Sequence, residues 1–321
     1  MLINNPFKIH LLLLGSAIAT KFTETLHHFE IREKFGKTTD GGSNVVRAAE
    51  NCEAIQRLYC LGHLYHLVVC HGSGIWKKVA LRIENESGSE SDDEDDNDEE
   101  WAINVDIVDS STPAEEITDK VGATCASVRK LVSFFRRSSR AGEVLREVSS
   151  NSENDFFTGI LPIDVKTRWS STYKMLTVVV KNINWIETAL NTLIDESSIQ
   201  SEKRRLSDLY LSRENIFLLK EIIPVLEMFK LATEMLSGRE YSTANLAYIT
   251  LFGLKRSLEQ TESSTSADQE NFKQSLLKQL LRYTWNCDNF NILFFKTAAF
   301  LDNNLLTSNR FNLGAGELFN E

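Results

Sequence analysis

The apolar residues of this chain recur with the period of an α-helix from about residue 121 to the C-terminal end. Val128, Leu131, Val132 and Phe135, for example, fall on one helical face. Only 4 of the 321 residues are proline, so few positions can interrupt a helix. The hydrophobic fraction of 42% is large enough to bury a core. The sequence therefore predicts an all-helical part over residues 121–321.

Five further helices are predicted in this part. Tyr173, Leu176, Val180, Ile183 and Leu190 fit one face of a helix that is capped by Ser170 or Ser171. The next predicted helix contains a proline, Pro224, which is expected to kink or divide it. The Ser- and Thr-rich stretch 259–268 is expected to be a loop. The proline-containing helix spans 214–236, and the remaining predicted helices span 246–258, 272–285 and 291–306.

Residues 1–75 mix strand and helix patterns. Short strands are predicted at Ile9–Leu14, Lys37–Thr39 and Arg57–Tyr59. Helices are predicted through Phe22, Leu26 and Phe29 after a cap at Thr20 or Thr23, from Ser43 to Glu50, and from Gly62 to Cys70. Strands that alternate with helices indicate an α/β layer.

The apolar run from Leu11 to Ala19 has a second interpretation. With Lys8 before it and an Ala-x-Ala ending, it resembles a short signal peptide. The five cysteines are sparse and odd in number, which indicates reduced thiols rather than a disulfide framework and favours the buried strand. No stretch reaches the eighteen or so apolar residues of a membrane span, so no membrane partner is expected.

The negative net charge of the chain comes from one segment. Residues 84–100 hold eleven acidic side chains and no basic one, and the rest of the chain has 35 Lys and Arg against 34 Asp and Glu. Such a segment cannot bury apolar area and repels itself, so residues 76–120 are predicted to be a disordered acidic linker. The net charge of −10 therefore does not exclude nucleic acid as a partner.

Asp40 is the first candidate site residue. It follows a predicted strand and precedes Gly41-Gly42, so its carboxylate would project from a strand end. A carboxylate there can hold Mg²⁺, and two such metals held by three acidic residues activate a nucleophile for attack on a phosphodiester. One carboxylate cannot do this alone. The alternative is that Asp40 simply opens an Asp-Gly turn.

Cys60, His63, His66, Cys70 and His71 form a second group of candidates. On a helix, His63, His66 and Cys70 share one face, and Cys and His are the usual ligands of zinc. The interleaved Leu and Val residues favour the alternative, a helix that belongs to the core. All six histidines precede residue 72, so the helical part has none.

Arg168 and Trp169 form the third. A guanidinium can contact phosphate, and an indole can stack on an unpaired base. The alternative is that Trp169 anchors the start of a helix while Arg168 extends to solvent. Basic clusters at 136–140 and 203–205 support nucleic-acid binding weakly, because most such clusters are solvated faces.

In this order, the three groups resemble the middle of a transposase of the hAT superfamily, a family associated with BED-type zinc fingers. The resemblance begins with Thr38-Thr39-Asp40-Gly41-Gly42-Ser43-Asn44 and Cys60-Leu61-Gly62-His63. It continues with Thr167-Arg168-Trp169-Ser170-Ser171-Thr172-Tyr173. Weaker matches are residues 128–135, 140–145, 224–243 and 298–302.

The resemblance implies an RNase H-like core that is interrupted by a long helical insertion. The expected fold is thus mixed α/β and all-α, with an incomplete RNase H-like core in residues 1–75 and a predominantly helical chain overall. It implies that Asp40 is one member of an Asp-Asp-Glu triad and that Cys60 and His63 contact DNA or support the site. Arg168 and Trp169 would handle the transposon end. DNA, a second copy or a full-length relative are the implied partners, in the nucleus.

These 321 residues offer no match for the other two triad carboxylates, for a BED-type zinc finger or for the C-terminal dimerisation segment. The sequence is therefore expected to be an internal fragment that associates with nucleic acid without catalysis and needs no cofactor. Mg²⁺ would bind Asp40 only in a completed triad. The alternatives are a helical protein-interaction scaffold, whose acidic linker binds basic partners, and a transposase that is active only with a full-length partner.

Overall fold

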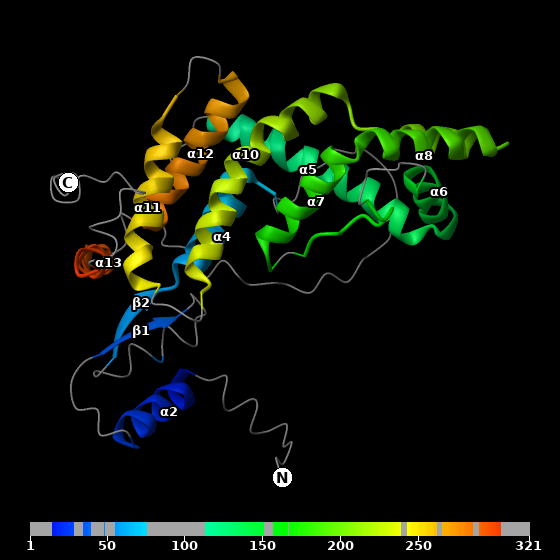
Figure 1. Ribbon diagram of the computed structural model, residues 1–321. Helices are drawn as coiled ribbons and strands as arrows, with labels where there is room; N and C mark the ends of the chain where they lie inside the picture. Colours follow the sequence, from blue (N-terminus) through cyan, green and yellow to red (C-terminus); the bar gives the residue numbers. More distant parts are fainter. Residues whose placement is uncertain are drawn as a thin grey trace, which may run out of the picture. The chain divides into compact units, whose positions relative to one another are not determined.

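The computed structural model describes residues 15–28, 35–39, 48, 55–75, 113–150, 157–165, 167–238, 243–261, 265–284 and 289–302. Within these residues the chain forms eleven helices and two strands, so it is predominantly helical, as predicted. It divides into two compact units (Figure 1). The first unit comprises Met1–Leu64 with Leu81–Ser110, and the second comprises Tyr65–Ala80 with Ser111–Glu321.

The first unit contains a parallel pair of strands. β1 (Phe35–Thr39) and β2 (Ile55–Tyr59) pair in register, from Phe35 opposite Ile55 to Thr39 opposite Tyr59. Both strands were predicted, and each begins two residues earlier than expected. A parallel pair needs a crossover connection, and Ala48 between the strands is helical. The predicted strand Ile9–Leu14 and Asp40 lie outside the described residues.

Helix α2 (Gly15–His28) precedes the strands and starts earlier than predicted. A cap at Thr20 or Thr23 is wrong, because both residues lie inside the helix. The Thr23 hydroxyl donates to the Ala19 carbonyl at 3.1 Å, which is how a threonine is accommodated within a helix.

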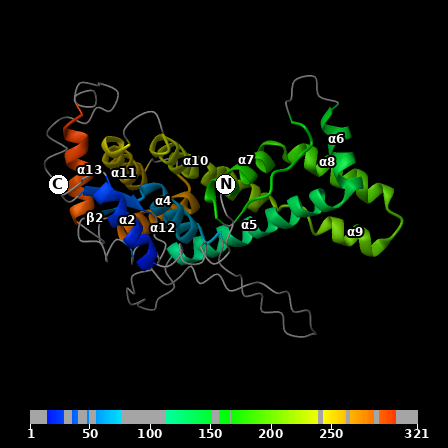
Figure 2. The ribbon, with the colours of Figure 1, turned by 90° about the horizontal axis from the view of Figure 1, so that it is seen from below.

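The second unit is an assembly of helices. The C-terminal turns of α4 (Leu61–Ser73) belong to it. α5 runs along the unit, with α6, α8 and α9 at one end and α11, α12 and α13 at the other (Figure 2). The helices are α5 (Pro113–Arg137), α6 (Ser139–Ser150), α7 (Trp169–Lys181), α8 (Ile183–Glu196), α9 (Gln200–Ser207), α10 (Arg213–Leu236), α11 (Ala244–Glu259), α12 (Ala267–Tyr283) and α13 (Asn289–Phe300).

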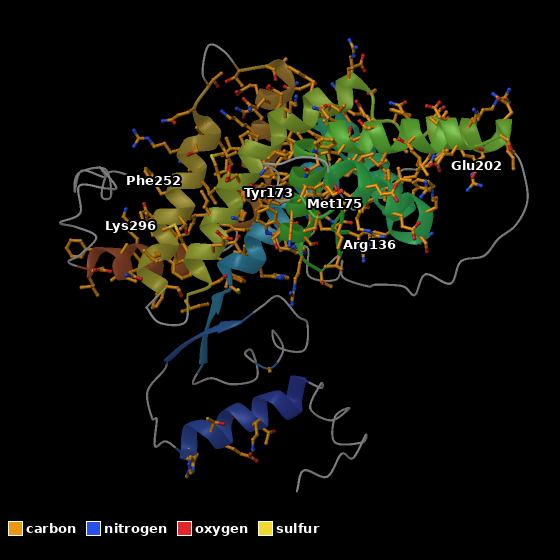
Figure 3. The ribbon with its side chains drawn as sticks, turned by 45° about the vertical axis from the view of Figure 1, so that its right-hand side comes forward. Arg136, Tyr173, Met175, Glu202, Phe252 and Lys296 are labelled. Carbon is orange, nitrogen blue, oxygen red and sulfur yellow. The ribbon has the colours of Figure 1, made fainter. Side chains whose placement is uncertain are left out.

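The core of the second unit is built from the apolar faces of these helices. Tyr65, Phe229 and Phe272 are fully buried, and the rings of Tyr65 and Phe229 meet edge to face at 6.1 Å. Tyr173 and Met175 of α7 lie between the two ends of the unit, with Glu202 at one end and Lys296 at the other (Figure 3). No helix among the described residues combines the length and apolar character needed to cross a membrane.

Backbone-to-backbone contact joins the end of α4 to α5. A Cβ on Gly122 of α5 would lie 2.6 Å from the carbonyl oxygen of Gly74, and Gly74 itself has a φ of 60°. The Ser275 hydroxyl of α12 donates to the Gly72 carbonyl at 2.9 Å. These contacts fix the last turn of α4 against two other helices of the unit.

The predicted face of α5 is confirmed, and most residues of the other faces predicted in this part are buried, but several helix ends differ. α5 begins at Pro113 rather than near 122, because its buried stripe extends back through Val121 to Ile117. Proline suits the first helical turn, since it needs no donor there. α5 therefore occupies part of the stretch predicted as linker, and residues 76–112 lie outside the described residues. Pro224 was expected to kink or divide its helix. It does not divide it, since α10 is one continuous helix that contains Pro224.

The helix predicted from Ser170 or Ser171 to Leu190 is two helices, which meet at Asn182. The side-chain amide of this buried residue donates to the Val178 carbonyl at 2.7 Å, in competition with the backbone. The eight-residue helix α9 was not predicted. Leu206 is its one buried side chain, so the apolar repeat that signals a helix is missing there.

Candidate nucleic-acid interface

The segment before α7 is held by a buried ion pair. The Asp164 carboxylate, with 2% of its side chain exposed, accepts a bifurcated hydrogen bond from the N–H at Arg129 Nε of α5, with its two oxygens at 2.9 and 3.1 Å. It also accepts a bond from the Thr172 hydroxyl of α7 at 2.9 Å. A charge-assisted pair of this kind ties the segment to two helices.

Cys125 lies one helical turn from this ion pair, and burial determines the protonation of its thiol. Cys125, one helical turn before Arg129, is completely buried, and desolvation raises the pKa of its thiol to about 12. The positive charge of Arg129 lowers this pKa and the negative charge of Asp164 raises it, but both effects are smaller than that of burial. The thiol is therefore kept protonated and unreactive.

A tight turn leads from Asp164 into α7. The Arg168 N–H donates to the Val165 carbonyl at 3.1 Å, and the Ser171 hydroxyl accepts from the Val165 N–H at 2.9 Å. The predicted N-cap at Ser170 or Ser171 is therefore wrong, since the cap position is Arg168. Ser171 closes the turn instead of capping the helix.

Trp169 is the first residue of α7, and only 3% of it is exposed. Its indole lies against Tyr173, with ring centroids 6.5 Å apart. This is the geometry of the helix-anchor alternative. The buried ring offers no free face to a base in this conformation, so any stacking on Trp169 would first require the start of α7 to open.

His66 links α4 to the same turn. Its Nδ1 atom accepts a hydrogen bond of 3.3 Å from the backbone N–H of Trp169. The Cys70 Sγ atom lies 3.7 Å from the His66 ring nitrogens. Two of the sequence groups, the His/Cys helix and the Arg-Trp pair, are thus joined directly within the second unit.

The surface around this anchored turn carries Arg168. Its side chain is exposed and forms no salt bridge with a described carboxylate. Three apolar side chains of the preceding segment, Ile160, Ile163 and Val165, are exposed as well. An exposed guanidinium that follows a segment with exposed apolar side chains is suited to contact a phosphate.

The other predicted site residues belong to the first unit. Cys60 follows β2, and its carbonyl accepts the Leu64 N–H at 3.0 Å, so it begins α4. Cys60 and His63 are both half-buried. The buried Leu64, Leu67, Val68 and Val69 show that α4 is a core helix. No cluster of three metal-ligating side chains is found within the described part of the chain, and Asp40 lies outside that part.

Two arginines of the first predicted basic cluster, Arg136 and Arg140, are engaged in structural contacts. Arg136 donates to the Leu161 carbonyl at 3.2 Å. Arg140 contacts Glu196 of α8 at 2.5 Å, and this hydrogen bond raises the pKa of Arg140 and lowers that of Glu196. In the cluster at 203–205, all three cations lie on α9, and Arg205 lines a pocket that is described below.

Asp164 is the site residue that sequence reasoning missed. A signal was present, because an aspartate between Ile163 and Val165 in an apolar segment is unusual unless it is paired. Its partner, Arg129, lies 35 residues earlier, so the pairing itself could not be predicted from local pattern.

Comparison with known protein families gives one match. Residues 111–209 match the model of the ZBED1 RNase-like helical domain. The matched stretch runs from the start of α5 to the end of α9 and includes Asp164, Arg168 and Trp169. The match points to a transposase-derived family of the hAT and ZBED type. A search of curated proteins found no match.

Proposed function

We propose that this chain is an hAT transposase-derived protein that associates with nucleic acid through the turn before α7. The observation that carries the proposal is the exposed Arg168 on a turn that is anchored by Asp164, Ser171 and His66. Prior fixing of the turn reduces the entropy lost when a phosphate is bound. The family match over residues 111–209 supports the transposase origin.

The first unit corresponds in this proposal to part of an RNase H-like core. The parallel pairing of β1 and β2, with a crossover between them and α4 after β2, supports it. Asp40, directly after β1, is proposed as the remnant of the triad, and Cys60 and His63 as residues that support the site or contact DNA.

These 321 residues are proposed to lack nuclease activity. A two-metal mechanism needs several carboxylates around Mg²⁺, and Asp40 alone matches the triad. The donor set therefore does not fit the metal pair. Nicking of supercoiled plasmid by the pure chain with Mg²⁺, lost in Asp40→Ala, would overturn this proposal.

The binding proposal is tested with a fluorescently labelled DNA duplex in an anisotropy titration. Arg168→Ala is expected to weaken binding several-fold and to reduce the salt slope by about one phosphate contact. Arg213→Ala, which removes an exposed arginine at the start of α10, serves as the control. Equal effects of the two substitutions would remove the special role of Arg168. In cells, the proposal places the protein in the nucleus, which imaging of a tagged chain tests.

The interaction-scaffold alternative is favoured by the exposed apolar side chains of α13 and the residue after it, Leu293, Phe300 and Leu301. It is distinguished by negligible DNA affinity in the same titration. The partner-dependent transposase is distinguished by strand cleavage that is seen only after a full-length hAT relative is added.

A further inference from the structure

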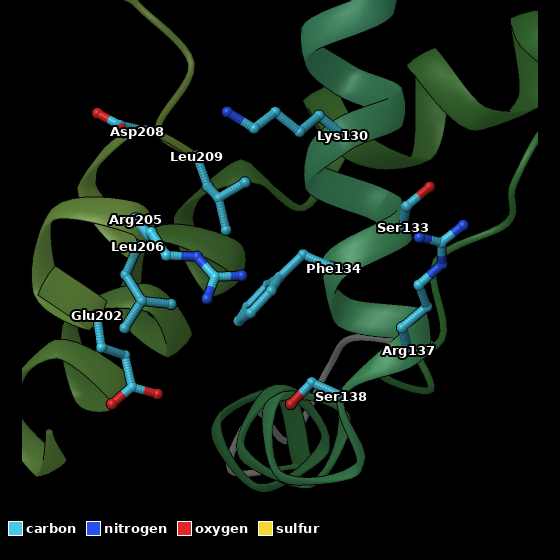
Figure 4. A pocket seen from close by; sticks show the side chains of 10 residues that line it. All are labelled: Lys130, Ser133, Phe134, Arg137, Ser138, Glu202, Arg205, Leu206, Asp208 and Leu209. Carbon is cyan, nitrogen blue, oxygen red and sulfur yellow. The ribbon is translucent and has the colours of Figure 1, made fainter. Parts of the chain in front are cut away.

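A pocket lies between α5 and α9, about 620 Å³ in volume (Figure 4). This size falls within the range of sites for small organic ligands. We call it the α5–α9 pocket. Phe134 of α5 lies on one side, and Arg205 and Leu206 of α9 lie on the other, with Leu209 beyond them.

The two sides of the pocket face one another with flat groups. The ring of Phe134 and the guanidinium of Arg205 point toward each other (Figure 4). Leu206 and Leu209 are buried and provide apolar walls. An aromatic ring on one side and a planar cation on the other are the two groups on which a nucleobase stacks.

The charges around the pocket favour an anion. Lys130 and Arg205 line the space beside Phe134, and neither forms a salt bridge with a carboxylate of the described residues. Arg137 also lines the pocket, but its guanidinium lies on the other side of α5 from Phe134 (Figure 4). Of the two acidic lining residues, Asp208 directs its carboxylate away from Phe134 (Figure 4). Glu202 accepts a hydrogen bond of 2.6 Å from the Ser197 hydroxyl.

A helix end adds to this field. Ser138, which lines the pocket, accepts the Ala141 N–H at 3.2 Å and so caps α6. The N-terminal end of α6 therefore lies at the pocket, and its partial positive charge adds to that of Lys130 and Arg205.

We propose that the α5–α9 pocket binds a nucleotide unit, with its base between Phe134 and Arg205 and its phosphate near Lys130. The ligand is a free nucleotide or one unpaired nucleotide of a strand, since both present the same ring and phosphate. Both faces of a base in a duplex are covered by its neighbours, so a duplex cannot use this pocket. The proposal deepens the proposed function and, for the strand, rests on it.

The test uses the full chain with a fluorescein-labelled twelve-residue oligo(dT) strand, a labelled duplex, AMP and inorganic phosphate. Two matched pairs of variants are compared. Arg205→Ala is paired with Arg204→Ala, an exposed neighbour on α9 that does not line the pocket. Phe134→Leu is paired with Phe217→Leu, an exposed phenylalanine of α10. Thermal melting checks that each variant folds.

Phe134→Leu is expected to weaken binding of the strand, of AMP or of both about tenfold, and Phe217→Leu to leave it unchanged. Arg205→Ala should weaken it more than Arg204→Ala does. AMP binding that depends on Phe134 assigns the site to free nucleotides, and oligo(dT) binding alone assigns it to a strand. Equal effects within both pairs, or inorganic phosphate that competes as well as AMP, would overturn the proposal.

The duplex separates this proposal from the proposed function. If the duplex binds and responds to Arg168→Ala while Phe134→Leu has no effect on any probe, the pocket assignment is wrong and the nucleic-acid function stands. If neither DNA probe binds, but AMP binds and Phe134→Leu weakens its binding, the pocket assignment stands and the nucleic-acid function is wrong.

Discussion

Replacement of Asp164 by alanine should destabilise the second unit strongly. The change removes the acceptor of the bifurcated bond from Arg129 Nε and of the bond from the Thr172 hydroxyl. The cation is left behind, with only 21% of the Arg129 side chain exposed to water. An unpaired charge at a buried site has lost its hydration without compensation.

The size of the expected loss in the free energy of unfolding follows from this burial. Removal of one partner of a buried pair costs about 3–5 kcal/mol, and the partial exposure of Arg129 places the expected loss near the lower bound, about 3 kcal/mol. If the free energy of unfolding falls by about 2 kcal/mol per molar urea, the urea concentration at the unfolding midpoint should fall by about 1.5 M. Asp164→Asn keeps an acceptor for Thr172 and should lose less. Adding Arg129→Met to Asp164→Ala should recover part of the loss, because it removes the orphaned charge.

Urea unfolding of the full chain, followed by circular dichroism, measures these shifts. Glu196→Gln is the matched control, because it breaks a similar Arg–carboxylate pair that is exposed on both sides. Exposed pairs contribute little to stability, so the control should leave the midpoint nearly unchanged. If Asp164→Ala moved the midpoint no further than Glu196→Gln, or if the double variant showed no coupling, the assignment of a buried anchor would be refuted.

Four further predictions concern the rest of the fold. Gly74→Ala should destabilise by more than about 1 kcal/mol in thermal melts, because the position has a φ of 60° and a Cβ would meet Thr118 at 2.6 Å. Gly253→Ala, where nothing lies within 4 Å of the new Cβ, should stabilise α11 by about 0.5–1 kcal/mol. Iodoacetamide at pH 8 should not label Cys125 in the native chain but should label it in urea, as read by mass spectrometry. The free energy of unfolding should fall as the pH rises from about 9 toward 12. The unfolded Cys125 thiol ionises near 9.0, whereas burial raises the pKa of the folded thiol to about 12, so only the unfolded chain loses this proton in that range. In urea melts, Cys125→Ala should make the free energy of unfolding less dependent on pH over the same range.

Local patterns predicted the helical faces well. All four residues on the predicted face of α5, Val128, Leu131, Val132 and Phe135, are buried. The period of apolar residues reports burial directly, so elements with a strong repeat could be found from sequence. The exposed helix α9 has no such repeat and was missed. The break at Asn182 was missed because the apolar pattern continues across it.

The connections of the candidate site could not be predicted in the same way. His66 and Trp169 are 103 residues apart, and no periodicity reports a contact over that separation. The two interpretations of Trp169 were equally compatible with its neighbours in sequence. Burial of its ring, which favours the helix anchor in this conformation, depends on how α7 packs in the folded unit.

The bond between His66 and residue 169 is made by the main chain, so it does not depend on which side chain occupies that position. Any amino acid except proline could supply the same donor. The tether and the indole are consequently separable by mutation: Trp169→Ala empties the space beside Tyr173 yet leaves the N–H in place to hold α4. Evolution has the same freedom: the side chain at position 169 can change while the hydrogen bond between α4 and α7 is kept.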